Sequence, residues 1–386
     1  MHRLAVRSAL RTDLYRRLPV ASATRRWVTR LYAPTLEDMK SLPTHQTTSN
    51  DGGVFIMYGR NPQPGDDFVG YNFFEEPHGF TAEQGFGYLE IEFGERLGPE
   101  GHYEVLRKLG WSIRSTTWLA KDTLTGRFVA IKVLNQCTTQ REMTGLSSER
   151  DVLRKISSCG EGFREMHCLS LLDDFTQPVK DDRDEEHICL VIDPLGLFSI
   201  PARAPGDIDI LLLVKKLLVN TLKGIHHLHS LRIVHTGIHP SNILMDLESR
   251  PDSLNIEAFL KFRPPEKYPP EETWGGKYVQ VARSQPFPPP PSEAAMSRSH
   301  ILSGFGTVAL CYLSNDQLKS CKGWLIDDPP RMDVDLYQIN KKIGALKSVA
   351  DLDGATALMK KCLRLNPKDR PSAKELLQDS WLNSGV

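Results

Sequence analysis

This sequence of 386 residues has no excess of positive or negative charge, no apolar run of membrane-spanning length and no closely paired cysteines. The 48 Lys and Arg residues balance 48 Asp and Glu residues, so no general attraction to nucleic acid or to a membrane surface is expected. The most apolar stretch, residues 208–222, is interrupted by Asp209, Lys215 and Lys216, which argues against a membrane span. With 40% hydrophobic and 25% charged residues, the composition is typical of a soluble globular protein.

The cysteines are scattered through the chain. There are seven, an odd number, and none forms a C-x-x-C pair. His167 and Cys168 are adjacent but have no second pair at the spacing of a metal site. This usage predicts reduced, mostly buried thiols in an intracellular protein.

The first 33 residues contain one acid, Asp13, among many basic residues. The basic residues are Arg3, Arg7, Arg11, Arg16, Arg17, Arg25, Arg26 and Arg30. An Arg-rich, acid-poor start suits a mitochondrial presequence at residues 1–33, and the alternative is a disordered basic arm. The expected location is therefore the mitochondrion for the first interpretation, and the cytoplasm or nucleus for the second.

Regular structure is predicted mainly from residue 103 onward. Residues 34–102 form an N-terminal extension with many Gly and Pro turns, and its aromatic residues between Tyr71 and Tyr88 suggest an arm that packs on a neighbouring domain. Strands are predicted at residues 103–109, 116–120, 128–134 and 187–192, with a turn at Thr125-Gly126 and one helix at residues 146–156. Together they indicate a small antiparallel sheet with one helix.

The second half is predicted to be mainly helical. A long helix is expected at residues 208–230, with an apolar face made of Leu211, Val214, Leu218, Leu222, Ile225 and Leu228. A strand at residues 243–245 and a Pro-rich, exposed insertion at residues 250–300 follow. Near the end, Ala355, Met359, Cys362 and Leu363 share one helical face, and Pro371 is placed in the first turn of a final helix.

Three motifs then occur in order, and the first is a possible phosphate-binding turn in residues 109–120. Such a turn needs small residues so that backbone N–H groups can approach phosphates. Of its three glycine positions only Gly110 is kept, and Ser112 and Ser115 hold the other two. Thr117 stands where a nucleotide-binding loop usually has Val over the adenine. An ordinary hairpin turn is the alternative for this motif alone.

The second motif is Val129-Ala130-Ile131-Lys132, which matches the V-A-I-K strand of nucleotide-binding kinases. A Lys at this place contacts nucleotide phosphates and pairs with a Glu of the following helix. Glu149 lies at a suitable position to be that partner. The alternative is a surface Lys and a solvated Glu.

The third motif, residues 233–244, follows the long helix. His235, Thr236, Ile238, Pro240 and Asn242 fit the pattern H-T-D-I-K-P-D-N. This is the catalytic loop of SR-protein kinases and their fungal relatives, and residues 284–286 and 365–373 also resemble that family. The chain from residue 103 onward therefore resembles an SR-protein-kinase-like serine/threonine kinase, and residues 73–97 resemble the segment that precedes the kinase domain in that subfamily.

The resemblance implies an α+β, bilobal fold. Residues 103–196 would be a small β-sheet N-lobe with its hinge, and residues 197–386 a mainly helical C-lobe interrupted by the insertion at 250–300. The implied ligand is ATP, and the implied protein partners are basic or Arg/Ser-rich; no direct nucleic-acid contact is implied. The nucleotide-binding set would be Gly110, Ser112, Ser115, Thr117, Lys132, Glu149 and Asp193.

The sequence departs from the family at the positions that carry the chemistry. Gly237 stands where the family has its Asp base, and His239 stands where the family has Lys. Residues 303–307 resemble the metal-binding D-F-G motif, but Gly304 replaces its Asp. Asn242 remains as a weak metal ligand, since one neutral amide holds Mg²⁺ poorly. No intact catalytic set is therefore expected. Binding of ATP is expected to be possible, whereas binding of Mg²⁺ is doubtful.

The stretch between Gly306 and Arg370 is also short for the family and contains no A-P-E motif. The C-lobe is therefore expected to be truncated, either in a diverged pseudokinase that repacks or in the product of a damaged or mispredicted gene. Three functions stay open: a serine/threonine kinase, a scaffold or weak nucleotide-binding module, and a decayed product. Each lost group normally contributes orders of magnitude to the rate, so impaired catalysis is favoured.

Overall fold

The structure is a computed structural model of the chain. It describes residues 46–48, 54–58, 69–160, 162–179, 185–197, 210–247, 256–273, 276–288, 297–307, 309–310, 348–364 and 367–384. The predicted presequence and residues 311–347 of the short stretch after Gly306 lie outside these residues. The chain divides into two compact units, residues 1–74 with 272–278, and residues 75–271 with 279–386.

The first unit contains a three-stranded antiparallel sheet in the order β1-β2-β3. The strands are β1 (Gln46–Thr48), β2 (Val54–Tyr58) and β3 (Val69–Phe73), and the longest ladder runs from Val54 opposite Phe73 to Tyr58 opposite Val69. The sequence predicted no strands here, because frequent Gly and Pro residues obscure the short alternating segments.

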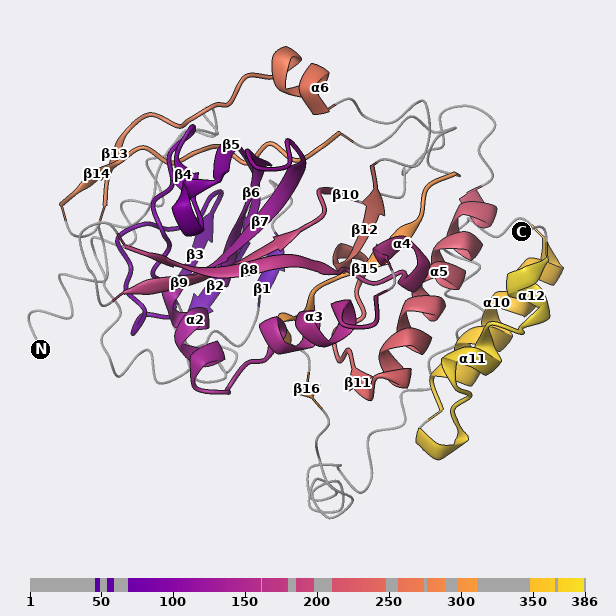
Figure 1. The fold of residues 1–386 in the computed structure, drawn as a ribbon. Helices are drawn as coiled ribbons and strands as arrows, with labels where there is room; N and C mark the ends of the chain where they lie inside the picture. Colours follow the sequence, from indigo (N-terminus) through magenta and orange to yellow (C-terminus); the bar gives the residue numbers. More distant parts are fainter. Residues whose placement is uncertain are drawn as a thin grey trace, which may run out of the picture. The chain divides into compact units, whose positions relative to one another are not determined.

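The second unit is built on a six-stranded antiparallel sheet in the order β4-β5-β6-β7-β9-β8 (Figure 1). The strands are β4 (Arg96–Leu97), β5 (Tyr103–Ser112), β6 (Ser115–Asp122), β7 (Phe128–Leu134), β8 (Leu171–Pro178) and β9 (Glu186–Ile192). All four predicted strands are present, and the predicted turn at Gly126 has a φ of 73°. The two edge strands were not predicted.

Two helices lie along one side of this sheet rather than the single predicted helix (Figure 1). They are α2 (Gln136–Met143), which contacts β9, and α3 (Glu149–Ser157), which contacts β8. The helix expected at residues 146–156 therefore begins later, and Leu146 lies outside it with 71% of its surface exposed. The buried face of α3 is Val152, Leu153 and Ile156. The polar α2 is capped by Asn135, whose side chain accepts a bond from the N–H of Thr138.

A second small sheet joins the six-stranded sheet to the long helix. Its order is β10-β12-β15, with β10 (Leu195–Leu197), the predicted β12 (Ile243–Asp246) and β15 (His300–Leu302). Beside it lie α4 (Phe163–Met166) and the pair β11 (Ile233–Val234) and β16 (Ala309–Leu310). One apolar cluster connects these elements and includes Leu153, Leu217, Ile243 and Phe305.

The long helix α5 (Ile210–Ser230) is packed on two sides, since it contacts β15 and also the helices at the end of the chain (Figure 1). The single apolar face predicted for it is therefore wrong. Of its six predicted members only Leu228 is buried, and Leu213 and Leu217 are buried instead. Leu218 and Leu222, from the predicted face, pack partly buried against the C-terminal cluster of Leu358, Leu376 and Leu382.

The C-terminal helices are α10 (Val349–Cys362), α11 (Ala373–Leu376) and α12 (Ser380–Asn383). The predicted face of α10 is wrong except at Ala355, because Cys362 and Leu363 are exposed while Leu352 and Leu358 are buried. Helix α11 begins after the N-cap Ser372 in a capping box with Glu375, so Pro371 precedes the helix instead of lying in its first turn. Short 3₁₀ turns occupy Pro99–Gly101, Pro240–Asn242, Phe305–Thr307 and Pro367–Asp369.

The region predicted as an exposed insertion is partly buried. It contains α6 (Ile256–Phe262) and the paired strands β13 (Glu271–Glu272) and β14 (Tyr278–Val279). Ile256, Phe259 and Phe287 pack with Leu119 of β6, so apolar burial overrides the Pro-rich composition here. The unbroken Pro run at residues 288–291 lies largely outside the described residues.

A buried ion cluster connects three separate segments of the second unit. The Lys108 ammonium of β5 lies 2.7 Å from Glu75 Oε2, contacts Glu76 and donates to the Ala282 carbonyl at 3.1 Å. Glu75 also accepts a bond from the N–H of Ser284 at 2.6 Å. Farther along the chain, Phe86 and Tyr88 are also buried. The Phe86 carbonyl accepts a bond from the N–H of Cys137. This part of the aromatic arm therefore packs within the same compact unit as the sheet, instead of on a neighbouring domain as predicted.

Five cysteines fall in the described residues and all are free. Cys168 and Cys189 are buried, but Cys159 and Cys362 are exposed, so the prediction of mostly buried thiols is only partly right. Among the described helices, none is both long enough and apolar enough to span a bilayer.

Candidate functional site

The best-formed part of the candidate site is an ion pair between β7 and α3. Lys132 Nζ donates to Glu149 Oε1 at 2.5 Å, and the Glu149 side chain is 3% exposed while that of Lys132 is 22% exposed. Lys132 is paired with Thr117 of β6 on one side and with Leu190 of β9 on the other. Its side chain therefore projects from a central strand of the sheet. The pairing predicted from the sequence is present, in a position where Lys132 keeps some access to solvent.

The turn between β5 and β6 is a tight hairpin with Ile113 and Arg114 at its tip, because Ser112 is the ladder partner of Ser115. The two hydroxyl groups lie 3.0 Å apart, and the N–H of Arg114 donates to Ser112 Oγ at 3.3 Å. Thus a backbone donor that a phosphate loop would offer is engaged by a Ser side chain. Gly110 has open space where a Cβ would stand.

Asn135 holds the tip of this hairpin in place. Its backbone N–H donates to the Arg114 carbonyl at 2.8 Å, and its side-chain amide donates to the Ile113 carbonyl at 2.9 Å. The Arg114 guanidinium then extends away from the hairpin, and Nη1 donates to the Gly306 carbonyl at 2.6 Å. The sequence prediction missed Arg114, although a cation at the tip of a possible phosphate loop was a signal available for it.

The loop that resembles a catalytic loop is bound to the D-F-G-like segment through His235. The N–H of Gly237 donates to His235 Nδ1 at 3.3 Å, which leaves Nε2 as the donor to the Ser303 carbonyl at 2.8 Å. The ring also packs on Phe305, with centroids 5.2 Å apart. Burial lowers the pKa of His235, so the ring is neutral at pH 7 and serves to join the two segments.

Gly304 and Asn242, which the sequence predicts to stand at the positions of the family's metal ligands, are in direct contact. Gly304 has a φ of 84°, and a Cβ built on it would lie 2.3 Å from Asn242 Cγ. The Asn242 side-chain amide donates to the Gly237 carbonyl at 2.9 Å. The two degenerate positions Gly237 and Gly304 are therefore brought together by Asn242, which packs where a side chain at position 304 would begin.

The other candidate residues are occupied by protein contacts. His239 is exposed, and its Nδ1 lies 2.8 Å from Ser241 Oγ. Asp193, placed in the nucleotide-binding set, contacts the Arg127 guanidinium. Asp246, the acid nearest in sequence after Asn242, is buried and accepts bonds from Arg164 at 2.6 and 3.0 Å, as expected for a residue that leaves the site along a strand. Within the described residues, no group of three or more His, Cys, Asp or Glu side chains could hold a metal ion.

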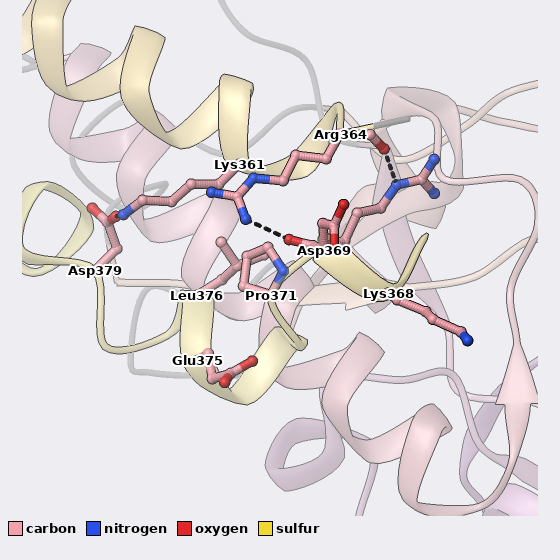
Figure 2. A pocket seen from close by; sticks show the side chains of 9 residues that line it. Lys361, Arg364, Lys368, Asp369, Pro371, Glu375, Leu376 and Asp379 are labelled. Atoms are coloured by element: carbon pink, nitrogen blue, oxygen red, sulfur yellow. Dashed lines mark hydrogen bonds and ion pairs between the residues drawn. The ribbon is translucent and has the colours of Figure 1, made fainter. Parts of the chain in front are cut away.

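A pocket of about 440 Å³ lies elsewhere, between the end of α10 and α11 (Figure 2). Its lining is strongly charged, and several of the charged groups are bonded to one another or to the backbone. Lys361 pairs with Asp379 at 2.7 Å, and Arg364 donates to the Asp369 carbonyl at 2.6 Å. Arg370, expected to need a new partner, donates to the Arg364 carbonyl at 2.6 Å. We regard this pocket as part of the C-terminal packing rather than as a second active site.

Comparison with known proteins supports the kinase interpretation of this geometry. Residues 103–259 match the family model of the protein kinase domain. Serine/threonine-protein kinase SRPK of Physarum polycephalum is 34% identical over 176 residues, which cover 44% of this chain and 39% of that protein. Protein kinase dsk1 of Schizosaccharomyces pombe is 34% identical over 178 residues, covering 45% and 31%. SRSF protein kinase 3 of Mus musculus is 32% identical over 167 residues, covering 41% and 28%.

The chain thus spans well under half the length of these curated relatives. A crystal structure of a kinase domain aligns with 76% of this chain and 98% of its own, with a TM-score of 0.45 and 16% identity. Residues 103–259 thus match the protein kinase domain model, over a region that has an N-terminal antiparallel sheet followed by helices, and the chain is distantly similar to SRPK-family kinases.

Proposed function

We propose that this protein is a kinase-fold module that binds ATP but transfers its phosphoryl group poorly or not at all. The observation that carries the proposal is the contact of Gly304 with Asn242, whose amide bonds to the carbonyl of Gly237. The two positions that should carry carboxylates are both glycines, and they are packed together rather than left open. Phosphoryl transfer depends on positioning and on charge neutralisation by metal ions, so these losses act on the central requirement.

Nucleotide binding is supported by Lys132 and Glu149. Their 2.5 Å ion pair holds the Lys132 ammonium at the sheet surface, where it can meet phosphate oxygens. The full proposed set is Gly110, Ser112, Ser115, Thr117, Lys132, Glu149 and Asp193. Mg²⁺ would supply charge neutralisation at the phosphates, but Asn242 is engaged with Gly237 and a side chain at position 304 would collide with it. These residues do not fit a magnesium site, and no step is assigned to the metal.

The proposed protein partner is basic or Arg/Ser-rich and intracellular. The support is similarity alone, since relatives 32% identical over 167 residues are named SRSF protein kinases. On this proposal the chain binds such a protein as a scaffold, without phosphorylating it. A residual serine/threonine kinase activity is the second candidate, and the intact pair of Lys132 and Glu149 is what favours it.

Thermal unfolding with and without ATP tests the nucleotide binding that both candidates require. ATP at 100 times its dissociation constant should stabilise the folded state by about 2.7 kcal/mol, a rise in Tm of about 5 °C. Lys132→Ala should abolish the rise, and Lys374→Ala, which removes an exposed cation on α11, should keep it. The readout is the change on adding ATP, so a lower starting Tm in Lys132→Ala does not affect it.

Two results would contradict the proposal. Unfolding that ATP leaves unchanged would exclude a nucleotide-binding module. Phosphate transfer to an Arg/Ser-rich peptide at about 1–100 per second, lost in Lys132→Ala, would establish an ordinary kinase instead.

A further inference from the structure

The guanidinium of Arg114 and the pair of Lys132 and Glu149 meet at one place, Gly306. Arg114 Nη1 donates to the Gly306 carbonyl at 2.6 Å. The position where a Cβ of Gly306 would stand lies 3.6 Å from the same nitrogen and 3.2 Å from Glu149 Oε2. Glu149 in turn accepts from Lys132. Glu149, the ion-pair partner of Lys132, and the guanidinium of Arg114 therefore both lie against Gly306 at this end of the site.

This arrangement supplies positive charge where the sequence has lost its metal ligands. Lys132 is largely balanced by Glu149, and the positions of the two missing carboxylates are Gly237 and Gly304. A bound triphosphate still needs neutralisation, and arginine provides it well because its planar guanidinium donates several N–H bonds in a fork that suits phosphate oxygens. In the described part of the chain, Nη1 makes the one side-chain bond of Arg114, so further donors of its five N–H groups are available.

The hairpin tip is braced in a way that suits this role. The Ile113 and Arg114 carbonyls are both held by Asn135, and the Tyr88 hydroxyl donates to the Ser112 carbonyl at 2.9 Å. The backbone N–H of Arg114 is occupied by Ser112, so the tip offers its side chain rather than its amide to a ligand. A fixed backbone carrying an exposed arginine lowers the entropy that is lost when the guanidinium binds a phosphate.

We propose that Arg114 is a phosphate ligand of the bound nucleotide and that its guanidinium takes the place of Mg²⁺, so that nucleotide binding does not depend on a divalent metal. This inference rests on the proposed nucleotide binding at Lys132. It assigns a role to a residue outside the predicted nucleotide-binding set. The competing explanation is that Arg114 only joins the hairpin to Gly306.

Titration with a fluorescent ATP analogue, in EDTA and in Mg²⁺, tests the role of the metal. For the unaltered protein we expect dissociation constants in the two buffers to agree within about threefold. Arg114→Ala should weaken binding in EDTA by about 10- to 100-fold, the effect expected for one charge-assisted bond. Arg114→Lys keeps the charge and should be intermediate, and Lys374→Ala should bind normally.

Competition by ATP, ADP and adenosine distinguishes a role of Arg114 as a phosphate ligand from a purely structural role. A phosphate ligand predicts that Arg114→Ala weakens ATP much more than adenosine, whereas a merely structural role weakens both alike. Arg114 is exposed at a turn, and a cooperative thermal transition for Arg114→Ala confirms that the variant is folded. If it is not folded, the ratio of ATP to adenosine affinity in Arg114→Lys and Arg114→Gln is compared instead.

The outcomes distinguish the two proposals. Binding only in Mg²⁺, or binding in which Arg114→Ala matches the unaltered protein, would overturn the role of Arg114 and leave the nucleotide-binding proposal standing. Absence of binding to the unaltered protein in either buffer would overturn both.

Discussion

Replacing Gly304 with Asp, the residue that kinases carry there, is expected to destabilise this protein rather than to restore a metal site. The new Cβ would lie 2.3 Å from Asn242 Cγ, 2.4 Å from Oδ1 and 2.6 Å from Nδ2. Asn242 would have to move, and its 2.9 Å bond to the Gly237 carbonyl would be lost. The φ of 84° adds backbone strain, because it lies in the left-handed region.

Gly85 provides a matched control, since its φ is 85° and nothing lies within 4 Å of the position of its Cβ. Gly85→Asp should therefore cost only strain, about 1–2 kcal/mol. Gly304→Asp should cost about 2–4 kcal/mol more, from crowding of about 1–3 kcal/mol and loss of one hydrogen bond worth about 1 kcal/mol. Denaturant unfolding measures both values.

A double variant tests whether the crowding is the cause. Asn242→Ala removes all three close atoms, so the extra cost of Gly304→Asp should nearly disappear in that background. Equal costs for Gly304→Asp and Gly85→Asp would refute the packing argument. So would stabilisation of Gly304→Asp by Mg²⁺ that the unaltered protein does not show.

Two other predictions concern stability. Gly354→Ala in α10 should destabilise the protein by about 1–3 kcal/mol, because the new Cβ would lie 2.2 Å from Trp381 Cδ1. Helix propensity alone would favour Ala by about 1 kcal/mol, so the sign of the change tests the packing. Denaturant unfolding measures the effect, and Trp381→Leu should relieve it. Burial, together with the charge of Lys216, lowers the pKa of His300 from 6.5 to about 4, so the unfolded chain binds more protons between these values. Stability should therefore be complete above pH 6.5 and fall by up to about 3 kcal/mol as the pH approaches 4, and His300→Gln should flatten an unfolding curve measured against pH.

The central strands could be predicted from the sequence because their burial is continuous. Residues 187–192 are all buried, and β7 was predicted with its observed bounds of Phe128–Leu134. The edge strand β8 was missed because Asp173 and Asp174 interrupt its apolar pattern, and an edge can keep such residues in solvent or in ion pairs. Apolar pattern reports burial, so it detects the middle of a sheet better than its edges.

Single-face helix predictions failed for a related reason. The pattern of α5 could not show that Leu217 and Leu218 face different neighbours, since both sides of the helix are packed. In the candidate site, motif order led to Lys132, Glu149, Gly237 and Gly304, which are local features of sequence. The contact of Arg114 with Gly306 joins residues far apart in the chain, and only the three-dimensional arrangement brings it out.

The ion cluster at Lys108 determines where the protein can be shortened for expression. The kinase family match begins at residue 103 and ends at residue 259, so a version trimmed to it would keep Lys108 and discard Glu75, Glu76 and the Ala282 carbonyl. An ammonium group left in an apolar interior without its acids costs several kcal/mol. The smallest piece expected to fold therefore begins no later than Glu75 and extends past Ser284, well outside the boundaries of the family match.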